Sequence, residues 1–89
     1  MDVKEAVRAA KQHLADLYAS ESIVHLGLEE VEYDDSHEQW RITLGFSRPW
    51  DQPFGILTTQ PSRRTYKVVV IANDGKAISV RNRETADAR

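Results

Sequence analysis

The chain contains no cysteine and no long apolar run. Without cysteine it can form no disulfide, no thiolate nucleophile and no cysteine-ligated zinc site. No stretch approaches the roughly 20 apolar residues needed to span a bilayer, and residues 1–14 lack the basic start and apolar run of a secretory signal. We therefore expect a cytoplasmic protein that does not enter a membrane.

Signatures of catalysis and of cofactor binding are also missing. No serine lies in a G-x-S-x-G turn, and no glycine-rich loop precedes a helix to hold phosphate. The polar residues 34–38 include groups that bind divalent ions, but hairpin tips favour such residues without a metal. The histidines have no metal-ligand spacing; they are His13, His25 and His37. We predict a protein that is not an enzyme and has no cofactor or metal.

Basic residues are scarce in the first part of the chain and acidic residues are scarce in the second. Residues 1–38 hold three basic and ten acidic residues, whereas residues 39–89 hold nine basic and four acidic ones. Such asymmetry can orient a charged partner or a second copy of the chain. The later basic residues could form a strip for nucleic acid, but the whole domain is acidic and has no recognised nucleic-acid motif, so we expect no nucleic-acid partner.

The N-terminal pattern predicts an amphipathic helix over residues 3–18. Asp2 and Glu5 have the spacing of a capping box, in which each side chain bonds the other residue's backbone N–H. The expected apolar stripe consists of Val3, Val7, Ala10, Leu14, Leu17 and Tyr18. This stripe should pack on the core.

Four strands are expected after the helix. The first begins at residue 24, and its apolar residues change phase near Glu29 and Glu30, which predicts a β-bulge there. Residues 39–47 alternate cleanly, with an inward face made of Trp40, Ile42, Leu44 and Phe46. In residues 64–72 we expect Tyr66, Val68, Val70 and Ala72 to face the helix, leaving Val69 and Ile71 on the reverse side as a possible oligomer face.

The last strand follows a tight turn. Asn73, Asp74 and Gly75 form a hairpin signal, because glycine adopts positive φ without steric cost. Residues 76–83 then continue as a strand with Ile78 and Val80 facing inward. The expected fold is α+β: one domain over residues 1–83, with an N-terminal helix packed on a four-stranded antiparallel meander sheet, and a flexible tail over residues 84–89.

The connection between the second and third strands is unusually rich in apolar residues. Long connections without secondary structure are usually functional or disordered, and this one, over residues 48–62, lacks the composition of a disordered segment. Its three prolines restrict the backbone, and its aromatic residues are types that anchor interfaces. We predict a partner-binding surface formed by Arg48, Trp50, Asp51, Phe54, Ile56 and Leu57, although the same apolar residues could instead fold back over the open end of the sheet.

The segments KEAVRAAKQHL and YKVVVIANDGKAISV resemble the PepSY-like group of small domains. That resemblance implies a helix-and-sheet fold and an inhibitory or regulatory binding role linked to peptidases, and it supplies no catalytic residues. The leading hypothesis is a non-enzymatic module that binds another protein or itself. One alternative is a domain that binds a small apolar ligand in a pocket lined by Trp40, Phe46, Tyr66 and Trp50. Another is an antitoxin or immunity protein.

Overall fold

The computed structural model describes residues 1–48 and 64–83. In element order they form helix α1 (Val3–Leu17), a short 3₁₀ turn η1 (Ala19–Glu21), and strands β1 (Val24–Asp34), β2 (Gln39–Ser47), β3 (Thr65–Ala72) and β4 (Ala77–Asn82). The strands form one antiparallel sheet in the order β1-β2-β3-β4. The predicted fold class, a helix on a four-stranded meander, is confirmed.

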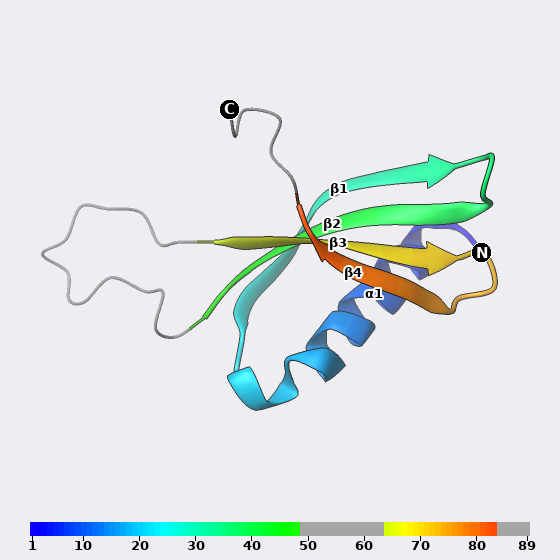
Figure 1. The fold of residues 1–89 in the computed structure, drawn as a ribbon. Coiled ribbons are helices and arrows are strands. Elements are labelled where there is room, and N and C mark those ends of the chain that lie inside the picture. The colour runs from blue at the N-terminus through cyan, green and yellow to red at the C-terminus, as the bar shows by residue number, and fades with distance from the viewer. Residues whose placement is uncertain (49–63, 84–89) are drawn as a thin grey trace, which may run out of the picture.

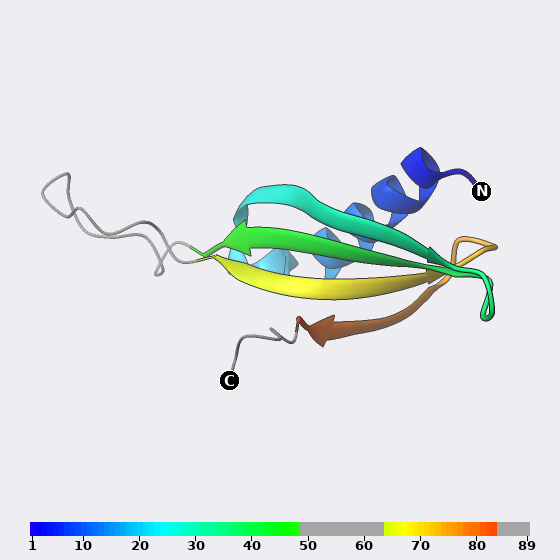
Figure 2. The same ribbon diagram turned by 90° about the horizontal axis from the view of Figure 1, so that it is seen from above.

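Helix α1 lies across one face of the sheet and contacts all four strands (Figures 1 and 2). The predicted capping box is present: Glu5 N donates to Asp2 Oδ1 at 2.8 Å, and Asp2 N donates to Glu5 Oε1 at 3.0 Å. No helix in the described part of the chain has the length and apolar content that crossing a membrane requires.

The helix approaches the sheet through small side chains. Ala6, Ala10 and Leu14 are fully buried, whereas Leu17 is 56% exposed. The expected stripe is therefore wrong at Leu17 and at Val3, which is 41% exposed, because the surface that contacts the sheet runs along the two alanines; Tyr18 packs against the core as predicted. The lack of bulk of the alanines lets the helix backbone lie close to the strands.

The core lies between α1 and the inner face of the sheet. Ile42, Leu44 and Phe46 are fully buried there, as the alternation in β2 predicts, and Trp40 packs against them while remaining partly exposed. The predicted bulge in β1 is also present: Leu28 pairs with Leu44 and Glu30 with Thr43, so Glu29 is the extra residue.

The predicted facing of β3 is wrong. Val69 and Ile71, expected on the reverse side as an oligomer face, are fully buried in the core. Their cross-strand partners explain this, because Val69 pairs with Ile42 and Ile71 with Trp40, both on the inner face of β2. Tyr66, Val68, Val70 and Ala72 therefore alternate onto the opposite face of the sheet.

Strand β4 has an irregularity that the sequence did not signal. Val70 pairs with Ser79 and Ile71 with Ala77, which leaves Ile78 as an extra residue. Ile78 is 54% exposed instead of facing inward as predicted, while Val80 packs against the core. The predicted turn is present before β4, with Gly75 at φ +96°.

Candidate functional site

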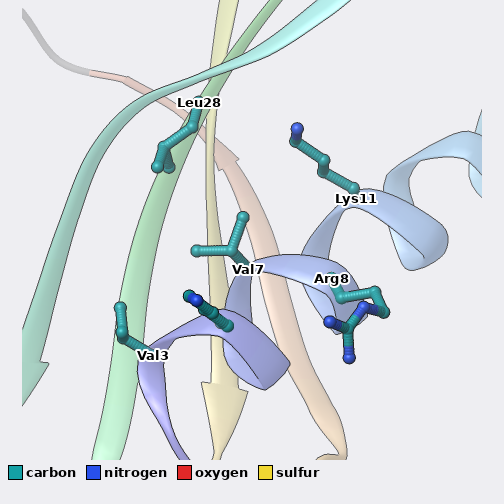
Figure 3. Close-up of a pocket in the computed structure, with 6 residues that line it drawn as sticks. Val3, Val7, Arg8, Lys11 and Leu28 are labelled. Atoms are coloured by element: carbon teal, nitrogen blue, oxygen red, sulfur yellow. The ribbon is translucent and has the colours of Figure 1, made fainter.

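A groove runs between α1 and β1 (Figure 3). Its volume is about 440 Å³, and it is lined by Val3, Lys4, Val7, Arg8, Lys11 and Leu28. We refer to it as the α1–β1 groove. It combines five residues from the first three turns of the helix with one residue from the edge strand.

The floor of the α1–β1 groove is apolar. Val3 and Val7 are one helical turn apart and therefore share a side of α1, and Figure 3 shows Leu28 across from them on β1. Val3 is 41% exposed and Leu28 is 44% exposed. The site is therefore an open groove whose apolar floor is in contact with water.

The rim of the α1–β1 groove is basic. Lys4, Arg8 and Lys11 follow one another at spacings of four and three, which places them along one side of the helix. In residues 1–48 and 64–83, none of these three side chains has an ion-pair partner. They supply all the basic residues of the otherwise acidic first 38 residues. The groove thus offers positive charge beside apolar surface.

Only one residue of the predicted loop surface falls within the described residues. Arg48 lies 3.2 Å from Glu21 Oε1, and its guanidinium carbon lies over the rings of Tyr18 and Phe46 at 5.5 and 5.6 Å. Its side chain is 24% exposed. Arg48 therefore joins the end of β2 to the residues after α1. The other predicted loop residues, Trp50, Asp51, Phe54, Ile56 and Leu57, lie outside the described residues, as does the tail over residues 84–89.

A second arginine is held at the start of β3. Arg64 donates to the His25 carbonyl at 3.1 Å and lies 3.5 Å from Glu29 Oε2. Arg64 and Glu29 meet over Gly45 of β2, where a Cβ would come within 2.8 Å of Arg64 and 3.0 Å of both Glu29 and Tyr66. Gly45 therefore gives the space in which Arg64 connects β1 to β3.

The predicted pocket for a small apolar ligand does not form from the residues proposed for it. Phe46 is fully buried in the core. Tyr66 pairs with Gly45, so it lies on the face opposite to Phe46 and Trp40. Trp50 lies outside the described residues. The strand phase that placed these aromatic residues together was wrong in β3.

Polar side chains gather at the β1–β2 turn without forming a catalytic relay. Asp34 accepts a hydrogen bond from Ser36 Oγ at 2.8 Å and lies 2.9 Å from His37 Nδ1. Ser36 contacts that same histidine nitrogen at 3.1 Å, so the ring does not stand between serine and carboxylate as a general base does. The described residues contain no group of three or more His, Cys, Asp or Glu side chains arranged to hold a metal.

Contacts in the β1–β2 turn shift the pKa of one carboxyl group, that of Asp34. The hydrogen bond from Ser36, followed by that with His37, lowers the pKa of Asp34 from 3.8 to about 2. Arg41 Nη2 lies 3.4 Å from the same carboxylate. These contacts fix the turn and give Asp34 a structural role.

In comparisons with known proteins, no family model matches the chain, and neither a curated protein nor a solved structure gives a significant match. The resemblance to PepSY-like domains therefore stays a prediction. Sequence reasoning identified neither the α1–β1 groove nor its basic rim. The spacing of Lys4, Arg8 and Lys11 could have indicated the basic rim. The groove itself also needs Leu28, and the bulge in β1 determines that Leu28 faces the helix side of the sheet.

Proposed function

We propose that the protein is a non-enzymatic binding or regulatory module whose α1–β1 groove receives an acidic segment of another protein carrying apolar side chains. The observation that carries the proposal is the apolar floor of this groove beside three basic side chains. The proposal retains the cytoplasmic location expected from the sequence.

Electrostatics favour an acidic occupant. Lys4, Arg8 and Lys11 have no ion-pair partner in the described residues, so their charges are available to carboxylates of a partner. Aligned like charges raise the local concentration of an oppositely charged segment and speed its association. The rest of residues 1–38 is strongly acidic and would repel the same segment elsewhere.

The shape of the groove favours a polypeptide over a small apolar ligand. Small-molecule sites bury about 70 to 90% or more of a drug-sized ligand. Here the floor residues Val3 and Leu28 are 41% and 44% exposed, so one side of an occupant would stay in water. A peptide tolerates this arrangement, because its polar backbone and charged residues can face solvent while its apolar residues occupy the floor.

Two further elements belong to the proposal. Segment 48–57 is a second contact with the partner, carried by Trp50 and Phe54, whose residue types anchor interfaces. Regulation of a peptidase is the role implied by the PepSY-like resemblance. In such a role the α1–β1 groove would be the part that receives a peptide segment of the partner.

The test uses fluorescein-labelled synthetic peptides of about 12 residues, rich in glutamate with leucine at every third or fourth position, measured by fluorescence anisotropy. Wild type should bind these peptides saturably at micromolar concentration, and its affinity for them should fall as the salt concentration rises. Arg8→Glu should weaken binding at least about tenfold, and Leu28→Ser should weaken it by a comparable amount. Lys76→Glu is the matched control, because it makes the same charge change in the β3–β4 turn.

Equal loss of affinity in Arg8→Glu and Lys76→Glu would mean that the peptide responds only to net charge, and the proposal would be wrong. Saturable binding of dodecanoate without saturable binding of the peptides would mean that the groove receives a small anionic amphiphile, and the proposal would be wrong.

The loop contact is tested separately through Trp50. An exposed anchor contributes little to folding, so Trp50→Ala should change stability by less than about 1 kcal/mol, whereas loss of a buried aromatic costs about 3 to 5 kcal/mol. Quenching of Trp50 fluorescence in a Trp40→Phe background gives the second measurement. Protection of Trp50 equal to that of a core residue would remove segment 48–57 from the proposed interface.

A further inference from the structure

The sheet face opposite α1 is covered by no other described element (Figure 2). We call it the open face. Its side chains follow from the pairing of the strands, because residues paired across neighbouring strands project to the same side. One row across the sheet consists of Glu30, Thr43, Val68 and Arg81. The next row consists of Glu32, Arg41, Val70 and Ser79.

These rows give the open face a charge gradient. Acidic residues occupy the β1 edge, where Asp34 continues the series of Glu30 and Glu32. The β4 edge carries Arg81, and Arg83 follows it, with its guanidinium carbon over the Tyr66 ring at 5.3 Å. Near Gly45 the face also carries Arg64, which is paired with Glu29 of β1. At the level of the two rows, the face therefore runs from negative to positive across about 14 Å, the width of three strand spacings.

Between the two edges the open face is hollow, and both polar and apolar side chains line the hollow. A depression of about 530 Å³ lies over β2, β3 and β4. Val68 and Val70 line it on β3, and the bulged Ile78, 54% exposed, stands at its side. Val70 is only 9% exposed, so the apolar surface that a second copy can cover consists mainly of Ile78 and Val68.

We propose that the open face binds a second copy of this chain, sheet against sheet, about a two-fold axis parallel to the strands. That axis places β1 of one copy over β4 of the other and keeps each row at its own level. Glu30 then lies over Arg81 of the second copy, and Thr43 lies over Val68. In the next row Glu32 lies over Ser79 and Arg41 over Val70. Because the dimer is isologous, each contact occurs twice.

Charge selects this axis over its perpendicular alternative. A two-fold axis in the same plane but across the strands would place β1 over β1 and β4 over β4. Glu30 would then face glutamate and Arg81 would face arginine, and like charges placed opposite each other cost several kcal/mol in an interface. Two sheets packed with their strands aligned within about 30° are also a common arrangement.

Arg41 does not oppose the packing, although it lies near the middle of the open face. Its guanidinium lies 3.4 Å from Asp34 and 3.9 Å from Glu32 of the same chain. Its charge is therefore already paired, and its aliphatic stem is the part that meets Val70 of the second copy. Arginine stems pack against apolar surface in this way.

The expected dimer is weak. The open face measures about 14 Å across the strands and about 20 Å along them, so two copies would cover only about 560 Å² in total, which is less than most specific interfaces bury. We expect a dissociation constant of about 10 to 100 µM. The α1–β1 groove lies on the other side of the sheet, so this inference is independent of the proposed function and can fail without it.

The experiment is sedimentation velocity of the full chain from about 5 to about 500 µM, at low and high salt. Wild type should shift from monomer to dimer over this range. Arg81→Glu and Glu30→Arg should each weaken dimerisation at least about tenfold, since each places like charges opposite one another twice. The Glu30→Arg/Arg81→Glu double variant should recover the wild-type constant within about threefold, as should the two single variants mixed in equal amounts.

Lys11→Glu, on the groove side, is the matched control and should dimerise like wild type. Circular dichroism melts establish that each variant is folded. A wild-type monomer at the highest concentration would overturn the inference. A double variant as weak as either single variant would also overturn it, because Glu30 and Arg81 would then not face each other.

Discussion

The two faces of the sheet have similar apolar residues in β3 but very different surroundings. On the inner face, Val69 and Ile71 are fully buried beneath α1 together with Ile42, Leu44 and Phe46. On the open face, Val68 and Val70 lie between an acidic edge and a basic edge. The same residue type is thus fully buried beneath α1 on one side, whereas on the other Val70 is 9% exposed, Val68 is partly exposed and the proposed dimer would cover both. The difference arises from strand register alone, since adjacent residues project to opposite faces.

Substitutions on the inner face should lower the free energy of unfolding most. Leu44→Ala should lower the free energy of unfolding by about 2 to 5 kcal/mol, because it leaves a cavity among fully buried neighbours. Ile78→Ala on the open face should lower it by less than about 1 kcal/mol. Denaturant melts of both variants test this pair, and similar losses would mean that Ile78 is part of the core.

Neighbouring valines give a sharper comparison with identical chemistry. Val69→Ala should cost about 1.5 to 3 kcal/mol, since it removes buried apolar surface, and Val68→Ala should cost less than about 1 kcal/mol in the monomer. Melts at low protein concentration separate folding from association. A larger loss of unfolding free energy in Val68→Ala than in Val69→Ala would mean that Val68 faces the core, as the sequence alone suggested.

The stability of helix α1, which covers the inner face, should depend modestly on its N-terminal cap. Asp2→Ala removes the carboxylate that accepts from Glu5 N. Loss of such a cap costs about 0.5 to 2 kcal/mol. Asp2→Asn, which keeps an accepting side-chain oxygen, is the control and should lose less; equal losses would exclude the cap hydrogen bond as the cause.

The smallest effect concerns acid, at the acidic edge of the open face. The pKa of Asp34 is lowered from 3.8 to about 2. Since the folded state favours the ionised form, its contribution is complete above about pH 4 and is lost as the pH falls toward about 2. Urea midpoints of wild type and Asp34→Asn between pH 6 and pH 2 should converge on acidification. A constant difference across this range would contradict the assignment.

Much of the fold followed from local patterns. The β2 alternation identified one side of the core because each apolar residue there is followed by a polar or small one. The phase change in β1 located the bulge at Glu29, since an unbulged strand would expose half of its apolar residues. The Asp2 and Glu5 spacing identified the cap. In each case the information lay within a few residues of the feature.

The predictions were wrong where the sequence pattern did not indicate which face of the sheet a residue lies on. The run from Val68 to Ile71 is apolar in both phases, so only its register against β2 decides which residues face α1. Nothing in the sequence around Ile78, neither a pair of charged residues nor a change of phase, indicates the bulge there. The α1–β1 groove joins Val7 to Leu28, which lie on different elements, and the charge gradient of the open face joins four strands. Such arrangements depend on tertiary pairing.

The pairing of Phe46 with Thr65 has a consequence for protein engineering. It holds the end of β2 and the start of β3 about 5 Å apart. Loop closure costs only about 0.6 kcal/mol more for each doubling of length. We therefore expect a peptide epitope inserted between Arg48 and Arg64 to change the free energy of unfolding by little, and denaturant melts of such a variant test this.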